Sequence, residues 1–169
     1  GENSTARPLA TRSKPIRILY SGIIYPEKRD PGPLFEAISH MNLGSDEIKV
    51  SFYGQDLRGV QELASKHRVE QCVEVNPPIP REEILKLQSE ADILLLLLWD
   101  DPQEEGVYTG KLFEDIAAQR PILCIGCKDG VAARMVRDRR LGVAVSKPLE
   151  VVQALEKWIQ EFDANQEIA

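Results

Sequence analysis

The apolar run from Ala91 to Trp99, interrupted only by Asp92, constrains the fold of this chain more than any other segment. It is far too short to cross a bilayer, which takes ~20 apolar residues. A short run without polar alternation is typical of a strand that is buried on both faces. We therefore predict a central parallel strand at 92–98, enclosed between two layers of helices.

Short apolar runs and amphipathic stretches alternate along the rest of the chain, a pattern that indicates a parallel sheet wrapped by helices. This predicts an α/β fold, a Rossmann-like doubly wound parallel sheet of about six strands with helices on both faces. The predicted strands are 16–21, 48–53, 72–75, 92–98, 121–125 and 142–145. The predicted helices are 33–41, 57–67, 81–90, 111–119, 131–139 and 149–162.

The length of 169 residues suits one such domain, which we place at 15–163. Residues 1–14 are polar or small and are expected to be a linker or leader, and residues 164–169 a frayed tail. The first residue is Gly1 rather than Met. We therefore expect the natural protein to extend upstream of this domain.

The charge and the cysteine content of the chain exclude several classes of ligand and site. The net charge is −6, so a polyanion such as nucleic acid is not an expected ligand. Three cysteines, an odd and low number, argue against a disulfide scaffold and favour a cytoplasmic location. The spacing of Cys124 and Cys127 suggests a redox or zinc site, but Cys124 falls in a predicted strand, and zinc would need four ligands. We expect small buried thiols and no metal.

Ligands of doubly wound sheets bind outside the carboxyl ends of the strands. Four predicted loops lie there, at 22–33, 54–57, 76–80 and 99–110. The last of these leads into the predicted helix that follows the central strand. Backbone N–H groups at such a helix start are free to bind phosphate, and Gly110 allows a close approach.

Lys111 would add a positive charge at this helix start, and Glu114 lies one turn deeper on the same face. A carboxylate at that place can accept hydrogen bonds from two vicinal sugar hydroxyls. The alternative is an ordinary helix start, with Gly110 as its cap and Glu114 as an acid that favours the helix dipole. The residues alone leave both interpretations open.

The segment Gly110–Glu114 (GKLFE), followed by Ile116–Leu123 (IAAQRPIL), resembles the donor-site segment of family-4 GT-B glycosyltransferases. The resemblance implies that Glu114 holds the ribose hydroxyls of the nucleotide and that the backbone near Gly110 holds the donor diphosphate. The other donor-binding residues that it implies here are Tyr108, Thr109, Lys111 and Leu112. Many members carry a second Glu eight positions earlier, where this chain has Gly106. The adjacent Glu105 is our candidate for the sugar-contacting, catalytic role.

The segment Tyr20–Asp30 resembles the first strand and loop of the same family. Gly22 ends the strand and is a predicted donor-binding residue, and Lys28 stands at a position where the family has a diphosphate-binding lysine. Ile23 replaces the usual arginine, and Arg29 is the candidate to supply that charge. Lys28 and Arg29 are therefore predicted catalytic residues that stabilise the leaving diphosphate, the alternative being a solvated surface turn.

The Pro-rich loop 76–80 agrees with the resemblance, because the corresponding loop in the family packs against the nucleotide base. A stiff loop loses little entropy on ordering. The resemblance thus makes Asn76 and Pro78 donor-binding candidates. A simple strand-to-helix connector explains the same residues equally well.

The resemblance as a whole implies one half of a two-domain enzyme. It implies transfer of a hexosyl group from a nucleoside-diphosphate sugar to an acceptor hydroxyl, as in polysaccharide biosynthesis. Its partners would be the nucleotide sugar and an N-terminal acceptor-binding domain of the same protein, without which this chain is expected to be inactive. The family generally retains anomeric configuration and needs no metal or other cofactor. Peripheral membrane association of the full-length protein is an option.

Two other functions stay open. A GT-B nucleotide-sugar epimerase would need titratable groups near the sugar, and the loop from Asp100 to Glu105 offers several. A non-catalytic flavodoxin-like module would bind a partner protein instead. The remaining cluster of note is basic, and we interpret it as a solvated helix end that complements the dipole, with a membrane-surface role as the weaker alternative. Its residues are Arg134, Arg137, Arg139 and Arg140.

Overall fold

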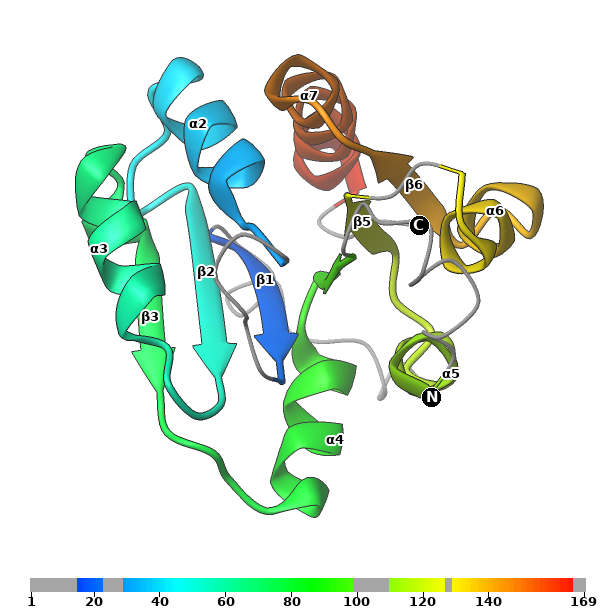
Figure 1. Ribbon diagram of the computed structural model, residues 1–169. Coiled ribbons are helices and arrows are strands. Elements are labelled where there is room, and N and C mark those ends of the chain that lie inside the picture. The colour runs from blue at the N-terminus through cyan, green and yellow to red at the C-terminus, as the bar shows by residue number, and fades with distance from the viewer. Residues whose placement is uncertain (1–14, 23–28, 99–109, 127–128, 166–169) are drawn as a thin grey trace.

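The computed structural model describes residues 15–22, 29–98, 110–126 and 129–165, and of residues 110–113 and 165 it describes the backbone only. Within these ranges six parallel strands form one sheet in the order β3-β2-β1-β4-β5-β6 (Figure 1). The α/β, Rossmann-like fold expected from the sequence is confirmed. The strands are β1 (Ile16–Ser21), β2 (Ile48–Tyr53), β3 (Val73–Asn76), β4 (Ile93–Leu97), β5 (Ile122–Ile125) and β6 (Gly142–Val145).

Helices cover both faces of the sheet (Figure 1). One layer consists of α2 (Gly32–His40), α3 (Arg58–Lys66) and α7 (Pro148–Asn165), and the other of α4 (Arg81–Glu90), α5 (Gly110–Ala117) and α6 (Val131–Asp138). The crossover to the second layer comes after β3 and the return comes after β6. Each helix that follows a strand therefore begins at the carboxyl end of the sheet, where ligand sites of such folds lie.

The central strand β4 is buried along its whole length, as its composition predicted. Leu95 and its alternate neighbours belong to the core layer that α2, α3 and α7 cover, while Leu96 belongs to the layer that α6 covers on the opposite face. The acid at the start of the apolar run has a structural role. The buried Asp92 carboxylate accepts a hydrogen bond from the backbone N–H of Arg17 at 2.8 Å, so it ties the start of β4 to β1.

Several element boundaries differ from the prediction by one to three residues, and three of these differences have a structural reason. A 3-10 turn at Glu70–Cys72 precedes β3, which therefore begins at Val73. Helix α5 starts at Gly110 and ends at Ala117, because Gln119 adopts a left-handed conformation with a φ of 59°. Helix α7 continues to Asn165 rather than Phe162, since no glycine or proline interrupts it.

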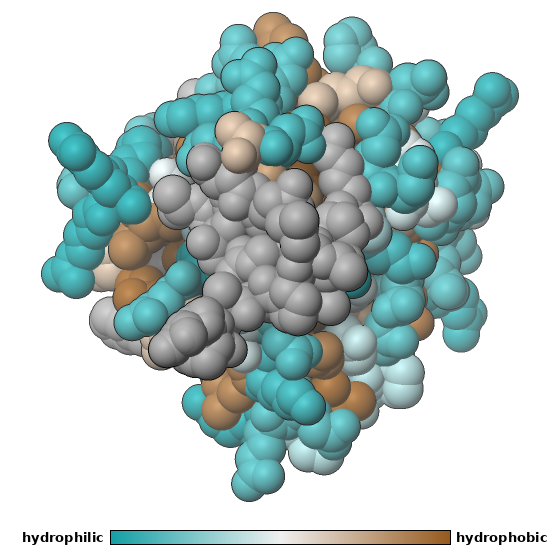
Figure 2. All heavy atoms as spheres, turned by 180° about the vertical axis from the view of Figure 1, so that it is seen from behind, coloured by the Kyte–Doolittle hydropathy of each residue, from teal (hydrophilic) through white to brown (hydrophobic). Residues whose placement is uncertain are grey.

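The cysteines agree with the prediction where they are described. Cys72 and Cys124 are both buried and neither forms a disulfide within the described ranges, and Cys127 lies outside the described residues. None of the helices in the described ranges is both long and apolar enough to cross a membrane. Seen from behind, the visible described surface is mostly hydrophilic, with apolar side chains in small groups between polar ones (Figure 2).

Candidate functional site

A cavity of about 360 Å³ opens where β1, β2 and the segment after β3 end. We call it the carboxyl-end cavity. It lies in the place where doubly wound sheets bind their ligands. Its lining is uncharged, and much of it is backbone or apolar side chain, which suits a flat apolar group such as a nucleobase. The lining residues are Ser21, Gly22, Tyr53, Gly54, Gln55, Pro78, Ile79 and Ile84.

Two glycines bring the strand ends close enough together to form this cavity. The N–H of Gly22 donates to the carbonyl of Tyr53 at 2.9 Å, and the N–H of Gly54 donates to that of Asn76 at 3.1 Å. A Cβ atom on Gly54 would collide with the carbonyl oxygen of Gly22. Because both partners are backbone, neither can yield easily, and the cavity depends on glycine at position 54.

Tyr53 supplies the one phenol among the described residues that line the cavity. Burial raises the pKa of Tyr53, and the carboxylate of Glu74 raises it further. The hydroxyl is therefore protonated at neutral pH and can both donate and accept a hydrogen bond. Asn76, a predicted donor-binding residue, instead directs its side-chain amide to the carbonyl of Phe52 at 3.4 Å and to Glu74 at 3.3 Å.

Glu114, the acid predicted to hold the ribose, lies in α5 and faces α4. Its Oε2 is 2.8 Å from Nη1 of Arg81, and Nε2 of Gln88 donates to its Oε1 at 3.3 Å. The Glu114 side chain is 20% exposed and that of Arg81 is 73% exposed. Glu114 thus points neither into the packed interior nor into open solvent, but occupies a half-buried place between two helices.

The α4 side of this arrangement connects Glu114 to the cavity. Arg81, Ile84 and Gln88 are spaced three and four residues apart, so they share one face of α4. Ile84 lines the cavity, while its two neighbours on that face hold the Glu114 carboxylate. Glu114 does not itself line the cavity, but it is anchored to the helix face that forms one wall of it.

The structure brings several predicted residues to this end of the sheet. Gly22 and Pro78 line the cavity, and the half-buried Arg29 lies three residues before the start of α2. The backbone of Gly110, Lys111 and Leu112 forms the start of α5, as predicted. Lys28, Glu105, Tyr108 and Thr109 lie outside the described residues.

Sequence reasoning named none of Tyr53, Ile84, Arg81 and Gln88 as site residues, and it placed Gln55 in a loop at this end of the sheet without giving it a role. Tyr53 ends a predicted strand and Gln55 follows it, so their position at the carboxyl end was a usable signal. The role of Arg81 and Gln88 had no such signal, because their partner Glu114 is 33 and 26 residues away in the chain. No group of three or more His, Cys, Asp or Glu residues in the described ranges could hold a metal ion.

Comparisons with known proteins bear on the fold. No family model matches the chain, and no curated protein matches it by sequence. Among solved structures, WaaG, a glycosyltransferase involved in lipopolysaccharide biosynthesis, matches with a TM-score of 0.69 at 18% identity over 93% of this chain. The chain has the fold of a glycosyltransferase domain.

Two further structures agree with this assignment of the fold. The lipopolysaccharide outer core galactosyltransferase WaaB matches with a TM-score of 0.60 at 18% identity over 89% of the chain. A glycosyltransferase from Rickettsia africae ESF-5 matches with a TM-score of 0.66 at 15% identity over 95% of the chain. The matches cover 41%, 42% and 44% of WaaG, WaaB and the rickettsial protein, so the chain spans less than half the length of these enzymes.

Proposed function

We propose that this chain is the donor-binding, C-terminal half of a GT-B glycosyltransferase, and that it binds a nucleoside-diphosphate sugar. The observation that carries the proposal is the uncharged carboxyl-end cavity, one wall of which is the α4 face that also holds Glu114. A nucleotide needs an apolar slot for its base beside an acceptor for its ribose hydroxyls. The similarity of fold to three glycosyltransferases supports the same function.

In this proposal the base occupies the cavity against Tyr53, Pro78 and Ile84. The ribose hydroxyls donate to Glu114, whose carboxylate is already oriented by Arg81 and Gln88. An oriented carboxylate needs little reorganisation when the ligand arrives, which favours binding. Asn76 contributes through the backbone of its loop.

The diphosphate would lie between the loop after β1 and the start of α5. Free N–H groups at Gly110 bind anions well, and Lys111 adds a charge. Lys28 and Arg29 stabilise the diphosphate as negative charge builds on it during departure, which lowers the barrier to transfer. Glu105 contacts the sugar. Transfer to an acceptor hydroxyl then requires the N-terminal domain, and the chain alone is inactive.

Two of the similar enzymes are described as acting in lipopolysaccharide assembly, so we extend the proposal to a carbohydrate acceptor in polysaccharide biosynthesis. We also propose a cytoplasmic location, hexosyl transfer without a metal or other cofactor, and peripheral membrane association of the full-length protein.

Calorimetric titration with UDP, GDP and ADP tests the donor-binding function. We expect one of them to bind, with NMR shift changes at Gly22 and Gly54. Glu114→Ala should weaken that binding by about 1–3 kcal/mol, the usual loss for a hydrogen bond to a charged group. Glu82→Ala is the matched control, because Glu82 is an exposed acid in the first turn of α4. Unchanged affinity in Glu114→Ala would remove Glu114 from the site, and no binding of any nucleotide would contradict the proposal.

A further inference from the structure

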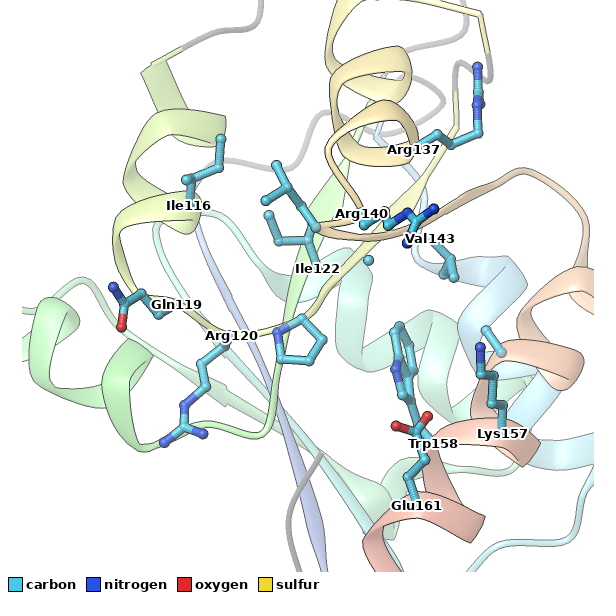
Figure 3. A pocket seen from close by; sticks show the side chains of 14 residues that line it. Ile116, Gln119, Arg120, Ile122, Arg137, Arg140, Val143, Lys157, Trp158 and Glu161 are labelled. Atoms are coloured by element: carbon cyan, nitrogen blue, oxygen red, sulfur yellow. The ribbon is translucent and has the colours of Figure 1, made fainter. Parts of the chain in front are cut away.

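A second, larger cavity lies at the opposite end of the sheet, where β5 and β6 begin. Its volume is about 530 Å³, within the range of small-molecule sites. It is enclosed by the ends of α5 and α6 and by the middle of α7, and we call it the amino-end cavity (Figure 3). Neither the resemblance nor the proposed function assigns any role to this end of the domain.

The charge of the amino-end cavity is opposite to that of the chain. Four cationic side chains line it, and Glu161 is the one acid among the described lining residues. The whole chain carries a net charge of −6. A locally positive hollow in an acidic protein attracts anions that the rest of the surface repels. The four cationic residues are Arg120, Arg137, Arg140 and Lys157.

Ordinary structural roles account for two of these cations. Arg120 donates two hydrogen bonds to the carbonyl of Ser89, at 3.2 and 2.9 Å, and extends away from the hollow in Figure 3. Arg137 is in the last turn of α6, where a positive charge complements the helix dipole. These two residues add to the positive potential but do not define a binding site.

Arg140 and Lys157 are less constrained by the fold. Arg140 lies two residues past the end of α6, where the helix dipole favours its charge but fixes no position for its side chain. Both are exposed, and within the described ranges neither forms an ion pair or a side-chain hydrogen bond. Lys157 lies in the middle of α7, far from either helix end, so the helix dipole does not call for it. Glu161 stands four residues further along α7, a spacing that allows an ion pair, yet the described structure has none there.

The wall beside these two cations is apolar. Trp158 lines the cavity although only 6% of it is exposed, and Val143 lies next to it. Figure 3 shows Arg140, Val143, Lys157 and Trp158 grouped on one side of the hollow. An indole face beside two cations fits a ligand that has an apolar or aromatic body and one anionic group.

We infer that the amino-end cavity binds a small phosphomonoester carried on an apolar body, with Arg140 and Lys157 on the phosphate and Trp158 against the body. An arginine and a lysine together match the charge of a phosphate dianion. Glu161 repels a second anionic group, so a single phosphate is preferred to a polyphosphate. This site lies at the opposite end of the sheet from the carboxyl-end cavity. Its existence does not depend on the proposed glycosyltransferase function.

The test is an NMR titration of the full chain with phenyl phosphate. We expect shift changes at the amides of Arg140–Val143 and Lys157–Glu161 and at the indole N–H of Trp158. Inorganic phosphate, which lacks the apolar body, and phenol, which lacks the charge, should each bind at least tenfold more weakly. A parallel titration with UDP reports on Gly22 and Gly54, so failure at one site is distinguishable from failure at the other.

Matched variants assign the binding to the cavity. Arg140→Gln and Lys157→Gln should each weaken phenyl phosphate binding about tenfold. Arg134→Gln removes the same charge from an exposed part of α6 outside the cavity, and it should change the affinity less than twofold. Both lining residues are exposed, so the fold of their variants is expected to persist and is checked by thermal unfolding.

Three results would overturn the inference. One is the absence of shift changes at residues 140–143 and 157–161. Another is an equal loss of affinity in Arg134→Gln and Arg140→Gln, which would mean a diffuse surface charge. The last is binding to vesicles of phosphatidylglycerol and phosphatidylcholine without binding of phenyl phosphate, which would make this end of the domain a membrane-facing surface.

Discussion

The carboxyl-end and amino-end cavities lie at opposite ends of one parallel sheet and are built from different materials. Backbone and apolar side chains around two glycines form the first, and its acid, Glu114, stands just outside it. Charged side chains from helix ends and from α7 line the second, beside an apolar wall that includes Trp158. The carboxyl-end cavity therefore depends on how closely the strand ends approach each other. The binding properties of the amino-end cavity depend instead on charges that the fold does not require.

Gly54→Ala should have the largest effect, and it should act on the carboxyl-end cavity and not on the amino-end cavity. The added Cβ meets the backbone of Gly22, so the strand ends must move apart, and we expect a loss of about 2–4 kcal/mol of stability. Gly59→Ala in α3 is the control, because its Cβ would meet no atom within 4 Å. This control should gain about 0.5–1 kcal/mol from helix propensity. Urea unfolding measures both, and equal stabilities would show that the close approach is not required.

Arg140→Gly should increase stability while it removes binding at the amino-end cavity. Arg140 has a φ of 54° just past the end of α6, a left-handed conformation that glycine adopts more easily by about 1 kcal/mol. Arg68→Gly makes the same change past the end of α3, where φ is 60°. Both variants should be more stable in chemical unfolding, but only the first should lose phenyl phosphate binding. A loss of phenyl phosphate binding in both variants would show that Arg140 has no specific role in the cavity.

Arg81→Gln tests the connection between Glu114 and the carboxyl-end cavity. The Arg81 side chain is 73% exposed, and an exposed ion pair contributes less than about 1 kcal/mol. Nucleotide affinity should therefore fall only about two- to fivefold, because Gln88 still holds the carboxylate. Arg58→Gln, the same change in the first turn of α3, should leave the affinity unchanged. Calorimetric titration measures the nucleotide affinity of both variants. An equal effect would mean that Arg81 acts only through the overall charge of the chain and not through Glu114.

The smallest expected effect concerns the titration of the Tyr53 hydroxyl in the carboxyl-end cavity. Burial and then Glu74 raise the pKa of Tyr53, so its proton is held more tightly in the folded chain than in the unfolded chain. The resulting stabilisation is present below the ordinary pKa of 10.0 and is lost as the pH rises through the raised pKa. Absorbance at 295 nm should show a late-titrating phenol that disappears in Tyr53→Phe. If the titration curves of the parent chain and Tyr53→Phe differed only in amplitude, Tyr53 would titrate like the other tyrosines, and its environment would not be special.

The sequence was sufficient for the sheet because hydrophobic patterning is local. The run at Ile93–Leu97 has a single plausible position, between two helix layers, and the other strands alternate with amphipathic helices. Helix ends were harder to predict, because Gln119 and Asn165 carry no strong stop or start signal. Local propensity does not report where a left-handed residue will end a helix.

The candidate site was predictable only in part. The helix start at Gly110 and the position of Glu114 within it follow from the local pattern. The partners of Glu114 do not, since Arg81 and Gln88 reach it only through the packing of α4 beside α5. The amino-end cavity was missed for the same reason. Arg140 and Lys157 are far apart in the chain, and the sequence offered only a solvated basic helix end for the former.

The hydrogen bond between Asp92 and Arg17 has a consequence for how the domain is put together. It joins segments 75 residues apart, at the seam where β1 pairs with β4 through Ile18 with Ile93 and Leu19 with Leu94. The two three-stranded halves of the sheet thus meet along a short backbone seam, reinforced where α2 contacts α7. A chain cleaved within the Pro-rich loop would yield two fragments with complementary edges, and these would be expected to reassociate without the covalent link.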